Sequence, residues 1–286
     1  MAYFLINPAS GNYSVGRVSR TIQNLEQTCQ TVHTLEVRSP ADVQRCCIAI
    51  NQQADPALIV VAAGDGTINA VVNSINPGKA TVAILPFGTS NVFAAEIGIS
   101  SIDDGLARIV RGETRPLSLG EISYQGRSQR FILMAGLGFD GAVARDVKPS
   151  LKHRIKQGAF ALSALTNAAK WDSSMCEVRT QTERVSCHSV VLCNAARYAG
   201  NFTLAPGCSP FSPGITACCI TESSRLTYAR MALDLFRGAP VIRGVRYITA
   251  DEFEISGNKP IQLDGDFVGY GPAKVTVLPD FFRIIV

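Results

Sequence analysis

Hydrophobic and polar residues follow two different patterns along the chain, and the change falls near residue 117. In the first part, short runs that are apolar throughout alternate with stretches in which apolar residues recur at helical spacing. The expected strands are Tyr3–Ile6, Val32–Val37, Leu58–Ala62 and Thr81–Leu85, and the expected helices are Val15–Cys29, Ala41–Gln53 and Ile68–Ile75. Strands buried on both faces need helices above and below them, so this part predicts a three-layer α/β domain with a mostly parallel sheet.

One more helix is expected before the pattern changes. It begins with Ser101–Asp104, which has the form of a capping box, and it ends at Gly112. The stretch Arg111–Leu117 that follows is expected to be a linker. The first domain is therefore predicted to comprise residues 1–116.

Short strand-forming segments dominate the remaining sequence. The expected strands are Leu119–Ser123, Arg130–Ala135, Cys176–Thr180, Val185–Asn194, Ile215–Ile220, Val245–Ala250, Glu252–Ser256 and Val275–Leu278. Two helices are expected, at Gly158–Lys170 and Leu226–Arg237, and a hairpin turn is expected at Tyr124–Gly126. Residues 117–286 are thus predicted to form a C-terminal, predominantly antiparallel β domain.

Composition excludes several classes of protein. Of 286 residues, 47% are apolar and 17% charged, which excludes a disordered, collagenous or coiled-coil chain. The net charge of +4, from 27 basic and 23 acidic residues, is too small to indicate nucleic-acid binding. No apolar run approaches the roughly 20 residues of a spanning helix, and the first residues lack the basic region of a signal peptide. Nine cysteines without metal-ligand spacing favour small buried thiols and a cytoplasmic protein.

Two glycine-bearing loops follow expected parallel strands and precede helices. They are Ala63–Thr67, which contains Gly-Asp-Gly, and Leu85–Asn91. Glycines allow a ligand to approach the backbone, and a helix N-terminus presents free N–H groups to an anion. An ordinary strand-to-helix turn explains the Gly-Asp-Gly segment about as well when it is taken alone. Two such loops at neighbouring strand ends are typical of ligand binding in open α/β sheets.

Two further loops are weaker candidates. Asn7–Gly11 ends the first expected strand and borders the same edge if that strand is central in the sheet. Leu263–Asp266 places two carboxylates beside a glycine, which could serve as a base and a metal ligand. Asp-Gly is also a common hairpin turn, and the turn is the favoured interpretation on these residues alone.

Three other features carry less information. Gly136–Gly141 fits the dinucleotide pattern G-x-G-x-x-G, but no acidic residue follows at the required offset and strands are expected next. His153 and His188 have no partners at catalytic or metal spacing. The basic residues Lys148, Lys152, Arg154 and Lys156 precede an apolar helix, where a solvated helix start is slightly favoured over attraction to anionic lipid.

The loops in this order resemble the diacylglycerol kinase catalytic family, bacterial lipid kinases related to sphingosine kinases within the NAD-kinase-like superfamily. The family's glycine-rich run around Asp and Thr matches Ala63–Thr67, its P-x-G-T-x-N loop matches Pro86–Asn91, and its opening N-P-x-S-G matches Asn7–Gly11. Arg130–Asp140 is similar to its R-F…G-x-G-F-D stretch, and Leu263–Asp266 to its late D-G-E. The resemblance covers nearly the whole chain.

This resemblance implies an N-terminal nucleotide-binding domain, a β-rich lipid or acceptor domain and an active site in the cleft between them. It implies transfer of the γ-phosphoryl group of ATP to a lipid hydroxyl with Mg²⁺. Any association with a membrane is expected to be peripheral, and no nucleic-acid partner is expected. Asp264 takes the position of the family's general base, and Asp65 and Asp266 those of residues that place the metal. The implied nucleotide-binding residues are Asn7, Ser10, Gly64, Asp65, Gly66, Thr67, Gly88, Thr89 and Asn91. Such chemistry needs mainly positioning and charge neutralisation.

The sequence departs from the family pattern in several places. Ala63 replaces the first glycine of the run, which is tolerable if its φ stays negative. Asp266 replaces Glu and is one methylene shorter, so its metal contact would pass through water. Val92 and Ala95 replace Asp and Arg. Ser118 and the turn Ser212–Gly214 replace acids that hold a second, structural Mg²⁺ in some relatives, which predicts that this second metal is absent.

Two other functions fit the residues less well. A nicotinamide-dinucleotide kinase shares a glycine-Asp loop and two domains, but it does not need Pro86–Asn91 or the Asp264–Asp266 segment. A nucleotide- or lipid-binding protein that has lost turnover would account for Ala63, Val92 and Asp266. The sequence identifies neither the acceptor lipid nor an oligomeric state.

Overall fold

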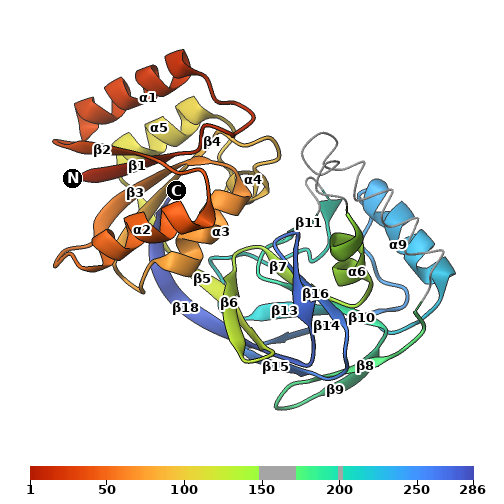
Figure 1. The fold of residues 1–286 in the computed structure, drawn as a ribbon. Helices are drawn as coiled ribbons and strands as arrows, with labels where there is room; N and C mark the ends of the chain where they lie inside the picture. Colours follow the sequence, from red (N-terminus) through yellow and green to blue (C-terminus); the bar gives the residue numbers. More distant parts are fainter. Residues whose placement is uncertain (148–171, 199–201) are drawn as a thin grey trace. The chain divides into compact units, whose positions relative to one another are not determined.

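The computed structural model describes residues 1–147, 172–198 and 202–286 (Figure 1). The chain divides into two compact units. The first comprises Met1–Ser118 together with Pro279–Val286, and the second comprises Leu119–Leu278.

The first unit is built on a parallel sheet. Its strands are β1 (Ala2–Ile6), β2 (Val32–Glu36), β3 (Ala57–Ala63) and β4 (Ala80–Pro86), in the order β2-β1-β3-β4. The end of β18 (Ala273–Ile285) adds a further parallel strand beside β4. The predicted parallel sheet is confirmed. β1 has a neighbouring strand on each side, which is the condition under which the Asn7–Gly11 loop borders the same edge as the other two loops.

Helices cover both faces of this sheet (Figure 1). They are α1 (Val15–Thr28), α2 (Pro40–Asn51), α3 (Asp65–Ser74), α4 (Val92–Glu96) and α5 (Ile102–Arg111). Helix α1 packs beside α5, and α2 packs beside α3. Phe4, Leu25, Leu85, Phe87 and Leu106 belong to the apolar core under α1 and α5. The three-layer α/β prediction is confirmed.

Local sequence signals explain where these helices begin and end. Ser39 and Asp42 form a complete capping box at α2, with Pro40 in its first turn. At α5 the Ser101 hydroxyl accepts the N–H of Asp104, whose carboxylate accepts the N–H of Ser100. Gly112 ends α5 in the left-handed conformation, with φ of 68°. The predicted start and end of α5 are confirmed.

The second unit consists mainly of two antiparallel sheets. One has the order β14-β13-β10-β7-β16-β17. Its strands are β7 (Met134–Leu137), β10 (Ser189–Cys193), β13 (Ile215–Ile220), β14 (Val245–Ala250), β16 (Pro260–Leu263) and β17 (Asp266–Tyr270). The other contains β5 (Thr114–Tyr124), β6 (Arg127–Phe131), β8 (Cys176–Arg179), β9 (Arg184–Cys187), β15 (Glu252–Ile255) and the first part of β18. Strands of both sheets contribute side chains to one apolar core, so the antiparallel β domain is confirmed.

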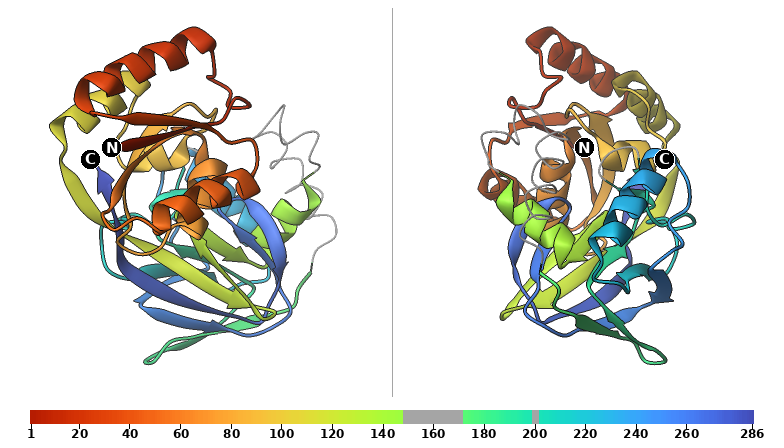
Figure 2. Two further views of the ribbon diagram at one scale, coloured as in Figure 1. Left: turned by 60° about the vertical axis from the view of Figure 1, so that its left-hand side comes forward. Right: turned by 90° about the vertical axis from the view of Figure 1, so that its right-hand side faces the viewer.

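Three shorter elements complete the second unit. They are α6 (Phe139–Asp146), α9 (Arg225–Phe236) and the small hairpin of β11 (Arg197–Tyr198) and β12 (Phe202–Thr203). Figure 2 shows α6 and α9 as separate helices outside the strands of this unit. The predicted hairpin turn at Tyr124–Gly126 is confirmed, since Gln125 and Gly126 join β5 to β6 with φ of 47° and 72°.

Several predicted boundaries were wrong. The expected linker Arg111–Leu117 is strand from Thr114 onward, because β5 continues through it and pairs with β18 and β6. The expected strand Arg130–Ala135 is interrupted at Ile132 and Leu133, whose N–H groups bind the Asp264 side chain instead of a neighbouring strand. The expected strand Val185–Asn194 is divided into β9 and β10 at His188.

One further difference concerns the extent of the two domains. The last eight residues, Pro279–Val286, belong to the first unit, whereas the sequence placed them in the second domain. They do so because the end of β18 pairs with β4. The expected helix Gly158–Lys170, the basic residues that precede it and His153 lie outside the described residues. Within the described part of the chain, no helix is long and apolar enough to cross a membrane.

Candidate functional site

Three loops of the first unit meet at the carboxyl edge of its sheet. The Gly88 N–H donates to the carbonyl of Ala63 at 3.2 Å, which joins the loop after β4 to the loop after β3. The Asn12 N–H donates to the carbonyl of Phe87 at 2.8 Å, which joins the loop after β1 to the same β4 loop. The structure therefore brings together the loops that the sequence placed at one edge of the sheet.

Polar side chains of these loops surround their glycines. Asn7 Nδ2 donates to the hydroxyl of Thr67 at 3.4 Å, and Thr67 is buried. The N–H of Ser10 donates to the carbonyl of Asn7 at 3.0 Å. A Cβ at Gly11 would collide with the hydroxyl of Thr89, which is itself exposed. The predicted residues Asn7, Ser10, Thr67 and Thr89 thus belong to one cluster.

The backbones of two loops pass at close range. A Cβ at Gly88 would lie 2.5 Å from the Cα of Gly64, so only glycine fits there. Gly66 differs, because it is exposed and a Cβ on it would meet nothing within 4 Å. Ala63 is the last residue of β3 and is absent from the residues with positive φ, so it meets the condition for replacing a glycine. The open side of the loops lies at Gly66.

Asp65 ties two of the loops together. Its Oδ2 accepts the N–H of Val92 at 3.1 Å and its Oδ1 accepts the N–H of Phe93 at 3.0 Å. Both donors open α4, where a negative charge is favourable. Because the donor at residue 92 is a backbone N–H, this contact with Asp65 does not depend on whether the side chain there is Val or the Asp of the family pattern. The three loops Asn7–Gly11, Ala63–Thr67 and Leu85–Asn91 are called the cradle below. These contacts fix the position of Asp65 in the cradle, and its role toward a metal stays a prediction.

The N-terminus of α3 is suited to an anion. Gly64 is its N-cap, and no side chain caps the helix. The first N–H groups of a helix have no intrahelical partner, and the helix dipole places partial positive charge there. A phosphate group is the ligand that such an end binds most readily.

Asn91 completes the loop after β4. It adopts the left-handed conformation with φ of 45°, which Asn tolerates better than most residues. Its Nδ2 donates to the carbonyl of Gly88 at 2.8 Å and to that of Pro86 at 3.3 Å. Its Oδ1 is buried and accepts no hydrogen bond from the described residues. A buried acceptor without a donor is uncommon, and here it marks a place where a ligand or water can donate.

A cavity of about 630 Å³ borders this cradle on the side of α1 and α5. Its charged lining residues are Arg17, Arg20 and Asp103, and Asn12 and Asn91 contribute from the loops. Arg17 Nη1 donates to the carbonyl of Asn12 at 2.6 Å. The sequence analysis missed both arginines, because a basic residue on a helix carries no local signal of the cavity that it lines.

Asp264 lies in the turn of the β16–β17 hairpin. Asp264 and Gly265 have φ of 47° and 91°, which confirms the favoured Asp-Gly turn. The Asp264 carboxylate accepts the N–H groups of Ile132, Leu133 and Met134 at 2.9, 2.9 and 3.0 Å. Asp266 is exposed at the start of β17. The predicted meeting of these carboxylates with the loops of the first unit stays a prediction, because they belong to the second unit.

A buried chain of hydrogen bonds supports this turn. Asp140 accepts a hydrogen bond from Tyr198 Oη and one from Gln262 Nε2, both at 2.6 Å. Gln262 Oε1 then accepts the N–H of Gly265 at 2.7 Å. Burial raises the pKa of Asp140, while the two hydrogen bonds act against that shift. Asp140 and Gln262 therefore orient the Asp264 turn, and sequence reasoning did not identify this role for either residue.

Residues 136–141 contain a strand–turn–helix after all. β7 is followed by α6, a helix that the sequence analysis did not predict. Both neighbours of β7, β10 and β16, are antiparallel to it, so the parallel βαβ unit of a dinucleotide site is absent at this strand. A dinucleotide site at residues 136–141 is therefore still rejected. The reason is the antiparallel pairing of β7, and not the absence of a following helix, since α6 is present.

The second unit contains one more buried polar network. His188 is 3% exposed, its Nδ1 lies 2.6 Å from Tyr228 Oη, and burial lowers its pKa. The Lys259 ammonium, also buried, contacts Asp172 Oδ2 at 3.0 Å and Ser174 Oγ at 2.7 Å. These contacts give His188 a structural role.

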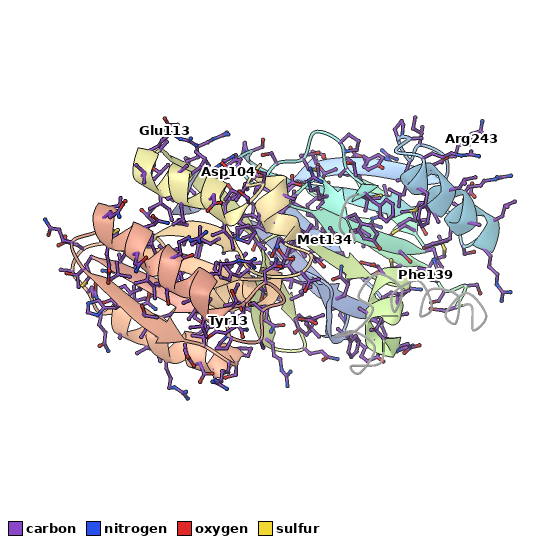
Figure 3. All side chains as sticks on the ribbon, turned by 90° about the horizontal axis from the view of Figure 1, so that it is seen from above. Tyr13, Asp104, Glu113, Met134, Phe139 and Arg243 are labelled. Atoms are coloured by element: carbon purple, nitrogen blue, oxygen red, sulfur yellow. The ribbon has the colours of Figure 1, made fainter. Side chains whose placement is uncertain are left out.

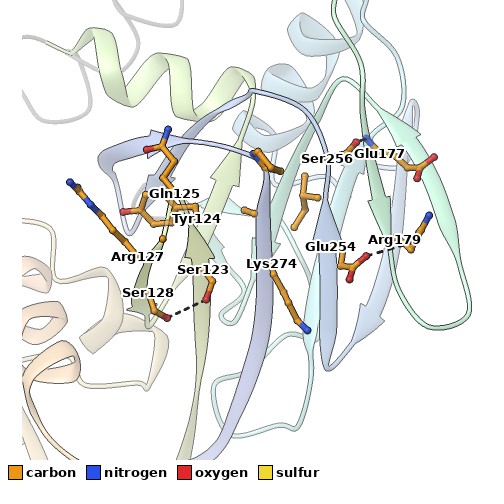
Figure 4. Close-up of a pocket in the computed structure, with 14 residues that line it drawn as sticks. Ser123, Tyr124, Gln125, Arg127, Ser128, Glu177, Arg179, Glu254, Ser256 and Lys274 are labelled. Atoms are coloured by element: carbon orange, nitrogen blue, oxygen red, sulfur yellow. Dashed lines mark hydrogen bonds and ion pairs between the residues drawn. The ribbon is translucent and has the colours of Figure 1, made fainter.

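The second unit has a further concave surface. It has a volume of about 780 Å³ and is lined by β5, β6, β8, β15 and β18 (Figure 4). Its charged residues pair on the sheet, as in Arg179–Glu254 at 3.9 Å and Lys274–Glu252 at 2.8 Å. None of the predicted site residues lines it.

Candidate metal ligands are sparse. The described residues contain no group of three or more His, Cys, Asp or Glu side chains placed to hold a metal ion. A magnesium ion in a phosphoryl-transfer site needs only one or two carboxylates plus phosphate oxygens. Asp65 and Asp266 each carry a ligand group of this type. All nine cysteines are free thiols, and six of them are buried, as expected from their apolar neighbours.

Comparison with known proteins follows the same division of the chain. A family model described as diacylglycerol kinase catalytic domain matches residues 1–122, and one described as YegS C-terminal NAD kinase beta sandwich-like domain matches residues 134–286. The chain belongs to this lipid kinase family. The resemblance inferred from the loops is thereby confirmed.

Individual relatives agree with this assignment. A diacylglycerol kinase of Bacillus subtilis (strain 168) is 26% identical over 299 residues, which cover 100% of this chain and 96% of that protein. A protein of Shewanella frigidimarina (strain NCIMB 400) that is named as a YegS-like lipid kinase is 29% identical over 188 residues. These residues cover 61% of this chain and 58% of that protein. A crystal structure of a diacylglycerol kinase from Bacillus anthracis str. Sterne has a TM-score of 0.75 at 16% identity, covering 99% of this chain and 96% of that one. This last likeness shows the fold.

Proposed function

We propose that this protein transfers the γ-phosphoryl group of ATP to the hydroxyl group of a lipid, with Mg²⁺ as the metal. The observation that carries the proposal is the joining of three glycine-bearing loops at the uncapped N-terminus of α3. Backbone N–H groups at such an end bind phosphate without any side chain. Family membership and the loop geometry therefore support the same reaction class.

The nucleotide would lie against the loops of the first unit. Gly64, Gly66 and Gly88 leave the backbone accessible, and Thr67 and Thr89 offer hydroxyl groups. Asn7, Ser10 and Asn91 complete the set, with the unpartnered Oδ1 of Asn91 available to a donor. Arg17 and Arg20 add positive charge in the adjoining cavity, which favours a polyphosphate.

Asp65 and Asp266 would hold the metal, Asp266 through water. When bound, Mg²⁺ neutralises charge on the phosphate oxygens. Asp264 is proposed as the general base that accepts the proton of the lipid hydroxyl, a role that contributes roughly 10²- to 10⁴-fold in rate. Its three backbone hydrogen bonds hold the carboxylate in one orientation, as a base requires.

A dinucleotide kinase is the second candidate. The C-terminal family model carries NAD kinase in its description, and the two enzymes would share the phosphate cradle. A binding protein without turnover is the third, motivated by Asp266 in place of Glu. We place the protein in the cytoplasm with peripheral access to the membrane, where the acceptor resides.

The three candidates are separated by incubating the protein with labelled ATP and Mg²⁺, either with a total lipid extract or with NAD. Label in the lipid phase supports the proposal, and label in NAD alone supports the second candidate. ATP binding without any labelled product supports the third. The variant Gly66→Ala, which has room for its Cβ in the free protein, is the matched control for contaminating kinases.

A further inference from the structure

Helix α9 presents an apolar stripe to solvent. Of its twelve residues only Thr227 is buried. Leu226, Leu233 and Phe236 are 55%, 46% and 76% exposed, and they share one helix face with the exposed Ala229 through spacings of three and four residues. Surface helices normally place polar residues on the outward face, so this face differs from that of a helix meant for water.

The other face of α9 is attached to the second unit. The ring of Tyr228 packs on that of Phe139 with centroids 4.8 Å apart, and its hydroxyl donates to Ser189 Oγ at 2.7 Å. At the end of the helix the Phe236 ring, although 76% exposed, also packs against the ring of Phe202 with centroids 5.0 Å apart, so it lies at the border between the two faces. The helix is therefore held in a defined orientation on the outside of the unit (Figure 2). The exposed side chains of Leu226 and Leu233 lie on its outward face.

Arginines surround the stripe. Arg225, Arg230 and Arg237 are exposed on α9 or immediately after it. The loop that follows adds Ile242, which is 70% exposed, and Arg243, which lies beside α9 at the edge of the second unit (Figure 3). Two acidic residues lie in the same region: Glu222 accepts a hydrogen bond from the hydroxyl of Thr227, and Asp234 is half-buried.

We propose that the outward face of α9, together with Ile242 and Arg243, docks onto the surface of an anionic lipid bilayer. Apolar side chains on one face with arginines at its margins are the composition of a helix that lies in the membrane interface. The idea rests on the proposed function in one respect, that the acceptor is a lipid. It places the membrane contact on a surface that the sequence analysis did not consider.

A second copy of the chain fits this face less well than a bilayer does. A two-fold dimer sets the same surface against itself, so the arginines of one copy would approach those of the other. Like charges placed together oppose association, whereas anionic headgroups neutralise them. Charge complementarity therefore favours the bilayer.

The test is co-sedimentation of the full chain with vesicles of phosphatidylcholine alone or mixed with phosphatidylglycerol. The apolar variant is Leu233→Ser/Phe236→Ser, and the charge variant is Arg230→Gln/Arg237→Gln. Matched controls in the first unit are Val110→Ser, which removes an apolar side chain that is 67% exposed, and Arg111→Gln. Circular dichroism and Tm of every variant verify that the fold is retained.

The wild-type chain and both controls are expected to bind the anionic vesicles and to bind phosphatidylcholine weakly. The apolar variant is expected to lose at least about tenfold in affinity, because each buried Leu or Phe contributes substantially. Each arginine removed is expected to cost about fivefold on anionic vesicles only. Equal binding by variants and controls overturns the proposal, as does equal binding to both kinds of vesicle.

Sedimentation in the absence of lipid examines the competing occupant. A wild-type dimer that becomes monomeric in the apolar variant, without any vesicle binding, assigns the face to self-association and overturns the proposal. Turnover of a short-chain, water-soluble acceptor reports separately on the proposed function. If that turnover fails while vesicle binding depends on α9, the kinase reaction is wrong and the docking surface stands.

Discussion

The replacement Asp264→Asn tests the structural role of the predicted base. In the wild type, Oδ1 accepts the N–H groups of Leu133 and Met134, and Oδ2 accepts that of Ile132. An asparagine retains one oxygen, which in its best orientation keeps the first two contacts. Its NH₂ group then faces the N–H of Ile132, so two donors oppose each other and neither has an acceptor.

The expected loss of stability follows from these three bonds. Losing one charge-assisted bond and leaving a buried N–H unsatisfied costs about 1.5–3 kcal/mol. The two remaining bonds go to a neutral oxygen and weaken by about 1 kcal/mol together. The total of about 3 kcal/mol lowers the Tm of a unit of this size by about 6–12 °C.

Thermal unfolding followed by near-UV circular dichroism measures this loss. Asp266→Asn is the matched control, because Asp266 is exposed on the same hairpin and its replacement is expected to change stability by less than about 0.5 kcal/mol. If Asp264→Asn unfolds within about 2 °C of the wild type, the three bonds do not stabilise the hairpin and the reasoning is refuted.

The same variant bears on the proposed reaction only when its folded fraction is known. Turnover is therefore to be measured at a temperature at which Asp264→Asn is still folded. Absence of turnover by the folded variant supports Asp264 as the general base. Turnover near the wild-type rate removes Asp264 from that role and leaves it a structural residue.

Three more outcomes are expected. Gly88→Ala is expected to lower the free energy of unfolding by at least about 2 kcal/mol, because its Cβ would lie 2.5 Å from the Cα of Gly64. Gly66→Ala is expected to keep the wild-type Tm and to lose nucleotide binding. Thermal unfolding and ATP titration measure the two effects, and a destabilised Gly66→Ala would contradict the prediction. Because the pKa of Asp140 is raised in the folded protein, its contribution to stability is full below the ordinary carboxyl value and is lost as pH rises through the raised value. The stability of the wild type relative to Asp140→Asn is therefore expected to fall between acidic and neutral pH in urea titrations, and a rising or flat difference would show that the shift has the opposite sign or is absent. Removing Mg²⁺ with EDTA is expected to abolish turnover without changing Tm by more than about 2 °C, and turnover that persists in EDTA would exclude the metal from the reaction.

The elements of the first unit could be predicted because their signals are local. The apolar runs of β3 and β4 are long enough to be recognised without knowledge of their neighbours. Ser101 and Gly112 mark the two ends of α5 through contacts that lie within the helix and its caps. Wherever residues close in sequence decide the structure, reading the sequence succeeded.

The errors lie where distant residues decide. β6 ends at Phe131 because the next N–H groups bind Asp264, which is more than one hundred residues away in the chain. Helix α6 escaped prediction because it is short and contains Gly141, a residue of low helix propensity. That glycine is needed because a Cβ there would collide with the carbonyl of Pro260, again a contact made only in the folded chain.

The candidate site divides in the same way. The loops at Gly64 and Gly88 were predicted from their positions after parallel strands, and their contact with each other confirms the placement. Arg17 was missed as a lining residue, and Asp140 was noted only as part of a family motif and not as a support of the Asp264 turn. Their partners become evident only when the cavity and the buried hydrogen bonds are seen.

Strand β18 has a consequence for how the protein is made. The ribosome synthesises Met1–Ser118 before Pro279–Val286, yet the strand that covers the free side of β4 belongs to the later segment. Until then the nascent first unit exposes an unpaired apolar edge, of the kind that pairs with other chains. We expect productive folding of this unit to be post-translational, and a fragment ending at Ser118 to be captured by chaperones or to aggregate.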